Sequence, residues 1–138
     1  DRPLPQSDPM LARYARRHLE QMLDRPNSGL GDKVRELVWL QLGSGHCTVE
    51  HVAEQLSLDR RTLHRRLARE KQTFSGIVET VRTEIVARTL PSRERPLTVV
   101  ADMLGFGSLS AFSRWFRTQF RTSPTRWRER HHRRGATP

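Results

Sequence analysis

Residues 99–116 read Val-Val-Ala-Asp-Met-Leu-Gly-Phe-Gly-Ser-Leu-Ser-Ala-Phe-Ser-Arg-Trp-Phe, the pattern of a short apolar helix, a tight turn and a second helix. Residues 49–67 repeat it as Val-Glu-His-Val-Ala-Glu-Gln-Leu-Ser-Leu-Asp-Arg-Arg-Thr-Leu-His-Arg-Arg-Leu. Up to the turn the apolar positions recur 48 residues later, pairing Val52, Ala53, Leu56 and Leu58 with Val100, Ala101, Leu104 and Phe106. Beyond the turn the offset is 49, pairing Leu63, Arg65 and Leu67 with Phe112, Arg114 and Phe116. A repeated helix-turn-helix unit can read DNA at two places, so the repeat is the main indication of function.

Helical periodicity accounts for the rest of the chain, and no segment alternates polar and apolar residues as a strand does. Three further helices are predicted over residues 9–23, 32–42 and 74–90, and a last short helix opens at Ser123-Pro124. Short polar residues mark the predicted helix starts: Asp8, Asp32, Thr48, Asp59, Thr98 and Ser108. We expect an all-α fold in which two helix-turn-helix subdomains are joined by a long linker helix, with an extra N-terminal helix.

Charge is high and unevenly distributed along the chain. The 25 lysines and arginines outnumber the 15 acidic residues and give a formal net charge of +10. Residues 60–134 hold 18 basic and 6 acidic residues, while residues 1–59 hold 7 and 9. This distribution favours a polyanionic partner, because phosphates that are neutralised by basic side chains release condensed counterions. The alternatives are a basic face that only keeps the protein soluble and a nonspecific module that binds RNA, acidic proteins or anionic membranes.

Several other function classes find little support in the sequence. No nucleophile elbow, glycine-rich phosphate loop or paired catalytic signature occurs, so we expect no enzymatic activity, no catalytic residues and no cofactor. The string from His46 to His51 offers three potential metal ligands, but it lacks a fourth ligand and paired spacing, so we expect no metal. No apolar run approaches the ~20 residues that span a bilayer. The single Cys47 rules out an internal disulfide and favours a reducing, cytoplasmic location.

Helical geometry predicts which side chains of the two second helices face solvent. In the first unit Leu63 and Leu67 mark the buried side, which places Arg61 and Arg65 opposite and His64 at a flank. In the second unit Phe112 and Phe116 mark the buried side. The opposite face there carries Ser110, Arg114 and Arg117, with Ser113 at one flank. An exposed face with these side chains can meet base edges in a major groove, where arginine bidentate to guanine is the commonest specific contact.

From about Val34 to Arg128 the chain resembles the DNA-binding domain of the AraC/XylS family of bacterial transcription regulators. The most specific stretch is residues 105–128, Gly-Phe-Gly-Ser-Leu-Ser-Ala-Phe-Ser-Arg-Trp-Phe-Arg-Thr-Gln-Phe-Arg-Thr-Ser-Pro-Thr-Arg-Trp-Arg. It is similar to the family signature of Gly-Phe, a Phe-Ser-Arg-x-Phe-Arg core, Phe-x-x-Ser-Pro and an aromatic-Arg pair. Two positions depart from the family pattern, because Ser57 and Arg121 stand where glycine is common.

The resemblance implies seven helices and sequence-specific binding of double-stranded DNA. Recognition helices at about residues 59–71 and 108–120 are expected in successive major-groove segments, about 34 Å apart. By position it implies DNA contacts at Arg60, Arg61, His64 and Arg65 in the first unit. In the second unit it implies contacts at Leu109, Ser110, Ser113 and Arg114, beside which Arg117 is expected from the helix geometry alone.

The resemblance also suggests a division of the chain and further partners. We expect residues 1–31 to be a linker and helix at the tail of a missing effector domain, and residues 32–90 to be the first subdomain with its linker helix. We expect residues 91–130 to form the second subdomain and residues 131–138 to be a disordered basic tail. The helix at 9–23 could pair with a copy of itself or pack on its own domain. RNA polymerase is a candidate partner, and a small-molecule effector would act only through the missing domain.

Overall fold

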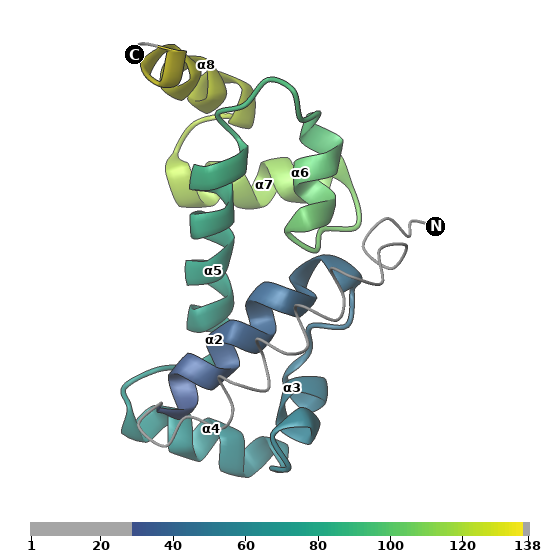
Figure 1. Ribbon diagram of the computed structural model, residues 1–138, viewed down its shortest axis with the longest axis vertical. Helices are drawn as coiled ribbons and strands as arrows, with labels where there is room; N and C mark the ends of the chain where they lie inside the picture. Colours follow the sequence, from purple (N-terminus) through teal and green to yellow (C-terminus); the bar gives the residue numbers. More distant parts are fainter. Residues whose placement is uncertain (1–28, 137–138) are drawn as a thin grey trace.

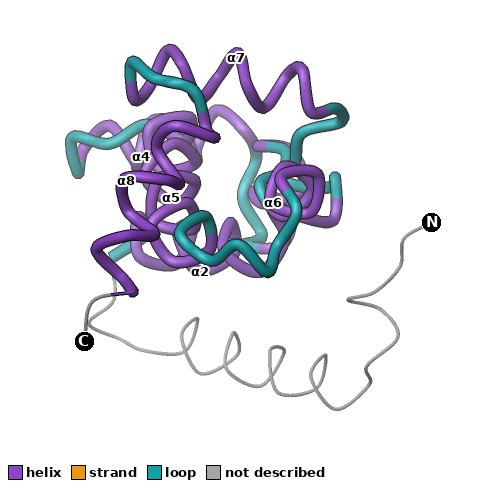
Figure 2. Tube along the Cα trace, turned by 90° about the horizontal axis from the view of Figure 1, so that it is seen from above, coloured by secondary structure: helices purple, strands orange, loops and turns teal. Residues whose placement is uncertain are grey.

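The computed structural model describes residues 29–136 of the chain, with side chains as far as residue 132. The helices of this part follow one another as α2 (Leu30–Gln41), the 3-10 turn η2 (Leu42–Ser44), α3 (Val49–Gln55), α4 (Arg60–Arg69), α5 (Phe74–Thr89), α6 (Leu97–Met103), α7 (Leu109–Phe120) and α8 (Pro124–Ala136). Residues 29–136 contain seven α-helices and no strand, which confirms the all-α fold (Figure 2). The helix predicted at 9–23 lies outside the described residues.

The long helix α5 runs between the two helix-turn-helix units. Figure 1 shows α2, α3 and α4 gathered around one end of α5 and α6, α7 and α8 around the other. The first unit is therefore α3 and α4 backed by α2, and the second is α6 and α7 backed by α8. This arrangement confirms the predicted architecture of two units joined by a linker helix.

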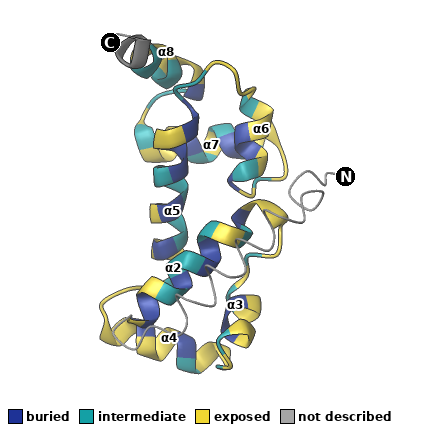
Figure 3. Ribbon diagram, in the orientation of Figure 1, coloured by how far each residue is buried: buried dark blue, intermediate teal, exposed yellow. Residues whose placement is uncertain are grey.

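One apolar cluster runs through both units along α5, and Figure 3 shows the buried positions as a stripe on the inner sides of the helices. Helix α2 packs on α5 and contributes the fully buried Val34, Leu37 and Val38. The recognition helices enter the same cluster through one apolar pair each. The pair on α4 is Leu63 and Leu67, and the pair on α7 is Phe112 and Phe116.

The two turns between the paired helices have the same hydrogen-bond pattern. In the first turn Leu58 N–H donates to the carbonyl of Ala53 at 2.9 Å, and in the second Phe106 N–H donates to Ala101 at 3.0 Å. Before these donors stand Ser57 with φ 60° and Gly105 with φ 85°, both in the left-handed region. This is the Schellman closure of a helix C-terminus, so the repeat seen in the sequence is also a repeat of the backbone.

Three of the predicted N-caps are confirmed by hydrogen bonds to the first turn of their helices. Thr48 Oγ1 accepts from His51 N–H at 3.1 Å, Asp59 Oδ1 from Thr62 N–H at 2.7 Å, and Ser108 Oγ from Ala111 N–H at 3.1 Å. These caps satisfy N–H groups that the helix itself leaves without partners.

Two predicted helix starts are wrong. Helix α2 begins at Leu30, two residues before the predicted start, so Asp32 lies inside its first turn and does not cap it. The cap comes from a distant residue, because the Glu70 carboxylate accepts from Leu30 N–H at 2.9 Å and from Gly31 N–H at 3.0 Å. Helix α6 begins at Leu97 after Pro96 rather than at Thr98. Proline suits a helix start, because it has no N–H to leave unsatisfied.

The C-terminal segment is also more regular than expected. Helix α8 continues to Ala136, so the disordered tail predicted from His131 is wrong for residues 131–136. The His131 ring stacks on Trp127 with the ring centroids 3.6 Å apart, and His132 Nδ1 lies 3.1 Å from the carbonyl oxygen of Pro91. These contacts hold the part of α8 that follows Trp127, the last apolar position in the sequence pattern.

Candidate nucleic-acid interface

The first candidate surface is the outer face of α4. Leu63 and Leu67 are fully buried, which fixes the rotation of the helix about its axis. As predicted, Arg61 and Arg65 are exposed opposite them, and His64 is exposed at a flank; Arg60, at the first position of the helix, is exposed as well. The side chains of Arg61 and Arg65 form no ion pair within the described part of the chain, so their guanidinium groups are available to an external anion.

Arg60 differs from its neighbours on α4. Its Nη1 lies 3.0 Å from Oε2 of Glu50 at the start of α3, and 63% of the Arg60 side chain and 61% of the Glu50 side chain are exposed. A solvent-exposed pair of this kind contributes only about 0–1 kcal/mol to stability. A phosphate can therefore replace Glu50 at small cost, and Arg60 is held by α3 until it does.

The second candidate surface is the outer face of α7. Phe112 and Phe116 are fully buried, and the predicted residues Ser110, Arg114 and Arg117 are exposed on the opposite side. Leu109 is 40% exposed at the first position of the helix, whereas Ser113 is only half-buried, in keeping with its predicted flank position. The structure thus collects the candidate residues into two separate surfaces, one on α4 and one on α7.

The N-terminus of α4 is stabilised by a charged cap. Hydrogen bonding from Thr62 lowers the pKa of the Asp59 carboxyl, and the positive charges of Arg65 and Arg61 lower it further. The cap residue of α7 is the neutral Ser108. The two candidate surfaces therefore differ in charge at their helix starts as well as along their exposed faces.

Ser57 and Arg121 stand where glycine is common in the family, and both adopt the left-handed backbone that glycine favours. Ser57 has φ 60° and Arg121 has φ 61°. A side chain in this conformation costs roughly 1–2 kcal/mol. Both positions end a helix, Ser57 after α3 and Arg121 after α7. The turns keep their geometry despite the unfavourable residues.

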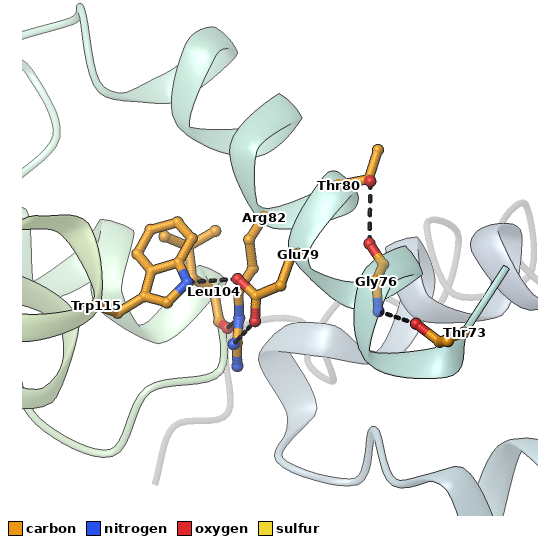
Figure 4. Close-up of polar contacts among 7 residues, drawn as sticks. All are labelled: Thr73, Gly76, Glu79, Thr80, Arg82, Leu104 and Trp115. Atoms are coloured by element: carbon orange, nitrogen blue, oxygen red, sulfur yellow. Dashed lines mark hydrogen bonds and ion pairs between the residues drawn. The ribbon is translucent and has the colours of Figure 1, made fainter. Parts of the chain in front are cut away.

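The sequence pattern did not predict a polar cluster that joins α5 to the second unit. Figure 4 shows the Trp115 indole pointing from α7 to the Glu79 carboxylate on α5, with Arg82 between Glu79 and Leu104. The Trp115 Nε1–H donates to Glu79 Oε1 at 2.5 Å, and Arg82 Nε–H donates to the Leu104 carbonyl at 3.1 Å. The only sign of the cluster in the sequence is that Glu79 and Arg82 interrupt the apolar positions of the helix predicted over residues 74–90. Their partners are 22 and 36 positions away in the sequence, so the pairing could not be read from it.

Arg128, the last residue of the signature-like stretch, also has a role that the sequence did not reveal. Its Nε–H donates to the carbonyl of Leu90 at 2.7 Å and its Nη2–H to the carbonyl of Arg95 at 2.6 Å. It therefore ties α8 to the end of α5 and to the loop that follows. Burial, followed by the charge of Arg93, lowers the pKa of this guanidinium.

No other kind of site emerges from residues 29–136. No group of three or more histidine, cysteine or acidic side chains in this part is arranged to hold a metal ion, and none of its helices is long and apolar enough to cross a membrane. Burial raises the pKa of the Cys47 thiol, although the nearby charge of Arg82 acts in the opposite direction. A thiol with a raised pKa is a poor nucleophile, so Cys47 is suited to packing rather than chemistry.

A family model described as a helix-turn-helix domain matches residues 52–130, which is more than half of the chain. The chain belongs to the AraC-type helix-turn-helix family. As an AraC-type domain it binds DNA sequence-specifically and comes from a family of bacterial transcription regulators, not of enzymes. The two units that the repeat predicted are thus the two halves of an AraC-type DNA-binding domain.

Named relatives support the assignment to the AraC-type family. The chain is 33% identical over 127 residues to the HTH-type transcriptional regulator VirS of Mycobacterium tuberculosis, covering 92% of this chain and 37% of VirS. It is 28% identical over 131 residues to the ornithine utilization regulator of Pseudomonas aeruginosa, covering 94% of this chain and 38% of that protein. The AraC-type domain thus spans well under half the length of these relatives.

Solved structures share the fold. A DNA-binding transcriptional dual regulator from Escherichia coli K-12 superposes with a TM-score of 0.71 at 19% identity, over 80% of this chain and 98% of that chain. The transcriptional regulator CdpR from Pseudomonas aeruginosa gives a TM-score of 0.67 at 24% identity, over 84% of this chain and 35% of that one. At these identities the likeness establishes the arrangement of helices in the AraC-type domain and nothing finer.

Proposed function

We propose that this AraC-type domain binds a bipartite operator, with α4 and α7 in successive major-groove segments of one DNA molecule. The observation that carries the proposal is the equivalence of Arg65 and Arg114. Both lie opposite the buried apolar pair of a recognition helix, 49 positions apart in a repeated unit. Both are exposed, and neither forms an ion pair within the described residues. An unpaired arginine on such a face is suited to bidentate contact with guanine.

The remaining candidate residues divide into base-reading and backbone-holding groups. Arg61 and His64 flank Arg65 on α4, and Ser110 precedes Arg114 by one helical turn on α7, so these side chains are suited to base edges. Residues at the start or rim of each face are suited to phosphates: Arg60, Leu109 through its backbone, Ser113 and Arg117. Because α4 carries three of the arginines, we expect tighter electrostatic binding by the first unit than by the second.

Selection of bound sites from a random pool of duplex DNA tests the bipartite operator. We expect two conserved half-motifs whose centres lie about 10 base pairs apart, the spacing of successive major-groove segments on one DNA face. Recovery of one half-motif would mean that α7 binds phosphate without reading bases. Recovery of no motif, with binding that depends only on salt, would support the nonspecific basic module instead.

Single substitutions test the base-reading arginines. Arg65→Ala and Arg114→Ala are each expected to cost roughly 1–3 kcal/mol on the selected operator and little on random DNA. Arg66→Ala removes the same charge from a flank of α4 and serves as the matched control, with similar small losses on both DNAs. Equal losses on operator and random DNA for Arg65→Ala would contradict a base-reading role for that residue.

The longer relatives suggest the setting in which this domain works. We infer that it is the DNA-binding end of a longer cytoplasmic regulator, with residues 1–31 at the tail of a segment that binds a small-molecule effector. RNA polymerase is the second partner in this proposal. The inference rests on the length of VirS and the ornithine utilization regulator, of which the chain spans 37% and 38%. Comparing operator affinity of the intact regulator with and without candidate effectors tests it.

A further inference from the structure

Two glutamates on α5 have partners of the same chemical kind but in different units. Glu84 accepts a hydrogen bond from the Trp39 indole at 3.3 Å and from Arg35 at 2.5 Å, both on α2 of the first unit. Glu79 accepts from the Trp115 indole at 2.5 Å, on α7 of the second unit. The Glu79 contact therefore joins the linker helix to the second recognition helix itself.

Arg82 strengthens this junction from one turn further along α5. Its Nη1–H donates to Glu79 at 3.2 Å, its Nε–H donates to the Leu104 carbonyl at 3.1 Å, and its Cζ lies 4.3 Å from the centre of the Phe106 ring. The side chain is only 18% exposed, while that of Glu79 is 37% exposed. Arg82 thus holds the turn between α6 and α7, and its burial makes the loss of any one of these contacts costly.

The second unit is also held to α5 by the shared apolar cluster and by the hydrogen bond from Arg128 to the Leu90 carbonyl. The closest backbone approach between elements of the two units joins the short turn η2 to α6. Beside this contact a groove of about 630 Å³ opens between the units, lined in part by Trp39, Val99 and Phe106. Because this region is not filled by packed side chains, the polar contacts of Glu79 and Arg82 add to the apolar core in fixing α7 against α5.

We propose that Glu79 and Arg82 are positioning residues that set the distance and rotation between α4 and α7. They thereby set the number of base pairs that the domain requires between its half-sites. The inference rests on the proposed bipartite function. A pair of recognition helices that is held rigidly binds one spacing best, because the second contact is then intramolecular at high effective concentration. Loosening the junction lowers that effective concentration at the preferred spacing and makes other spacings relatively better.

The experiment measures affinity for a series of duplexes that carry the selected half-sites at the preferred spacing and at one and two base pairs more or fewer. Each isolated half-site is measured as well. The variants are Glu79→Ala and Arg82→Lys, with Glu79→Gln as the conservative change that keeps an oxygen acceptor for the Trp115 indole. Glu84→Ala is the matched control, because it removes an equivalent indole and arginine partner from within the first unit. Circular dichroism at the assay temperature confirms that each variant is folded.

We expect Glu79→Ala and Arg82→Lys to lose roughly tenfold in affinity at the preferred spacing while binding each isolated half-site within about twofold of the wild type. Their preference for the best spacing over its neighbours becomes weaker. Glu79→Gln retains an intermediate preference, and Glu84→Ala keeps the wild-type spacing profile even if its thermal stability falls. A variant that proves unfolded is replaced in the comparison by Glu79→Gln, whose spacing profile then decides the question.

Two results would overturn the positioning role. The first is an unchanged spacing profile together with weaker binding to the isolated half-sites, which would give these residues a general structural role. The second is an equal change of profile in Glu84→Ala, which would show that any loosening of the domain has the same effect. Failure of the proposed function looks different, because the wild-type protein would then select no pair of half-sites at all.

Discussion

The carbonyl oxygen of Leu42 lies 2.6 Å from the point that a Cβ atom of residue 105 would occupy, so Gly105 is in contact with η2 through its own backbone. The same residue has φ 85°. Two separate constraints, conformation and space, therefore require glycine at this turn. In the first unit the equivalent position is Ser57, which is exposed and tolerates a side chain.

Gly105→Ala is expected to lower the free energy of unfolding by roughly 2 kcal/mol or more. The left-handed backbone alone costs about 1–2 kcal/mol for a residue with a Cβ atom, and the Leu42 carbonyl must also move. Chemical denaturation followed by circular dichroism measures the change. Because η2 contacts α6 at this point, a variant as stable as the wild type would show that this contact is easily displaced.

Arg121→Gly is expected to stabilise the domain by about 0.5–1 kcal/mol, because relief of the left-handed strain exceeds the entropy that glycine loses on folding. Ser57→Gly is expected to act in the same direction. Ser57→Gly changes no charge, so it should alter operator affinity little. Arg121 N–H donates to the Arg117 carbonyl at 2.9 Å, so Arg121→Gly also removes a charge beside the α7 surface and should weaken binding to operator and random DNA alike. Paired measurements of denaturation midpoint and DNA binding check the prediction, and a lower midpoint for both variants would contradict it.

Phe112→Ala is expected to cost about 3–5 kcal/mol of stability, the range typical of truncating a large buried aromatic side chain. Its ring is fully buried and lies 6.0 Å from Phe106 and 5.8 Å from Phe116 between ring centres. We expect the second unit to lose its structure first. Hydrogen exchange that increases across α6 and α7 before α2 would confirm this, whereas uniform exchange would indicate that the domain unfolds as one unit.

The charged cap at Asp59 predicts a pH-dependent contribution to stability. The folded pKa lies below the ordinary value of 3.8. The stabilisation is therefore complete above that value, and it is lost as the pH falls through the folded pKa. Asp59→Asn keeps a good cap but removes the charge. The stability difference between wild type and Asp59→Asn should shrink below about pH 4, whereas the difference for Ser108→Ala should be independent of pH.

Glu50→Gln is expected to strengthen DNA binding and to make it more dependent on salt. The change removes a negative charge from the candidate surface and frees Arg60, whose Nη1 lies 3.0 Å from Glu50. Each additional phosphate contact steepens the salt dependence by about one unit of slope. Arg60→Ala should have the opposite effect on the slope and reduce affinity alike for operator and random DNA. A salt slope that neither variant alters would exclude Arg60 from the phosphate contacts.

The sequence predicted those parts of the fold that depend on residues close together in the chain. The caps at Thr48, Asp59 and Ser108 and the turn at Gly105 each act within a few residues, so their patterns are local. The exposed faces of α4 and α7 followed from apolar pairs at helical spacing. The departures at Ser57 and Arg121 were also visible, because a left-handed turn without glycine is a local conflict.

Contacts between distant segments could not be predicted in this way. The cap of α2 depends on Glu70, about 40 positions away, so no local pattern announces it. The Glu50–Arg60 pair crosses from one helix to the next and required the geometry of the turn. The roles of Glu79 and Arg128 required the packing of α7 and α8 against α5. These side chains look like ordinary surface charges in the sequence and become distinct only when their partners are in place.

The hydrogen bonds from Leu30 and Gly31 to Glu70 place the start of α2 at the C-terminal end of α4. Gly29, the first described residue, therefore lies beside α4 and not beside α7. Helix α2 contacts α4 both through the Glu70 carboxylate and by direct packing, whereas it connects to the second unit through η2, which contacts α6. The two candidate surfaces thus differ in their connection to α2 as well as in charge: α4 contacts α2 directly, whereas α7 is reached through η2 and α6.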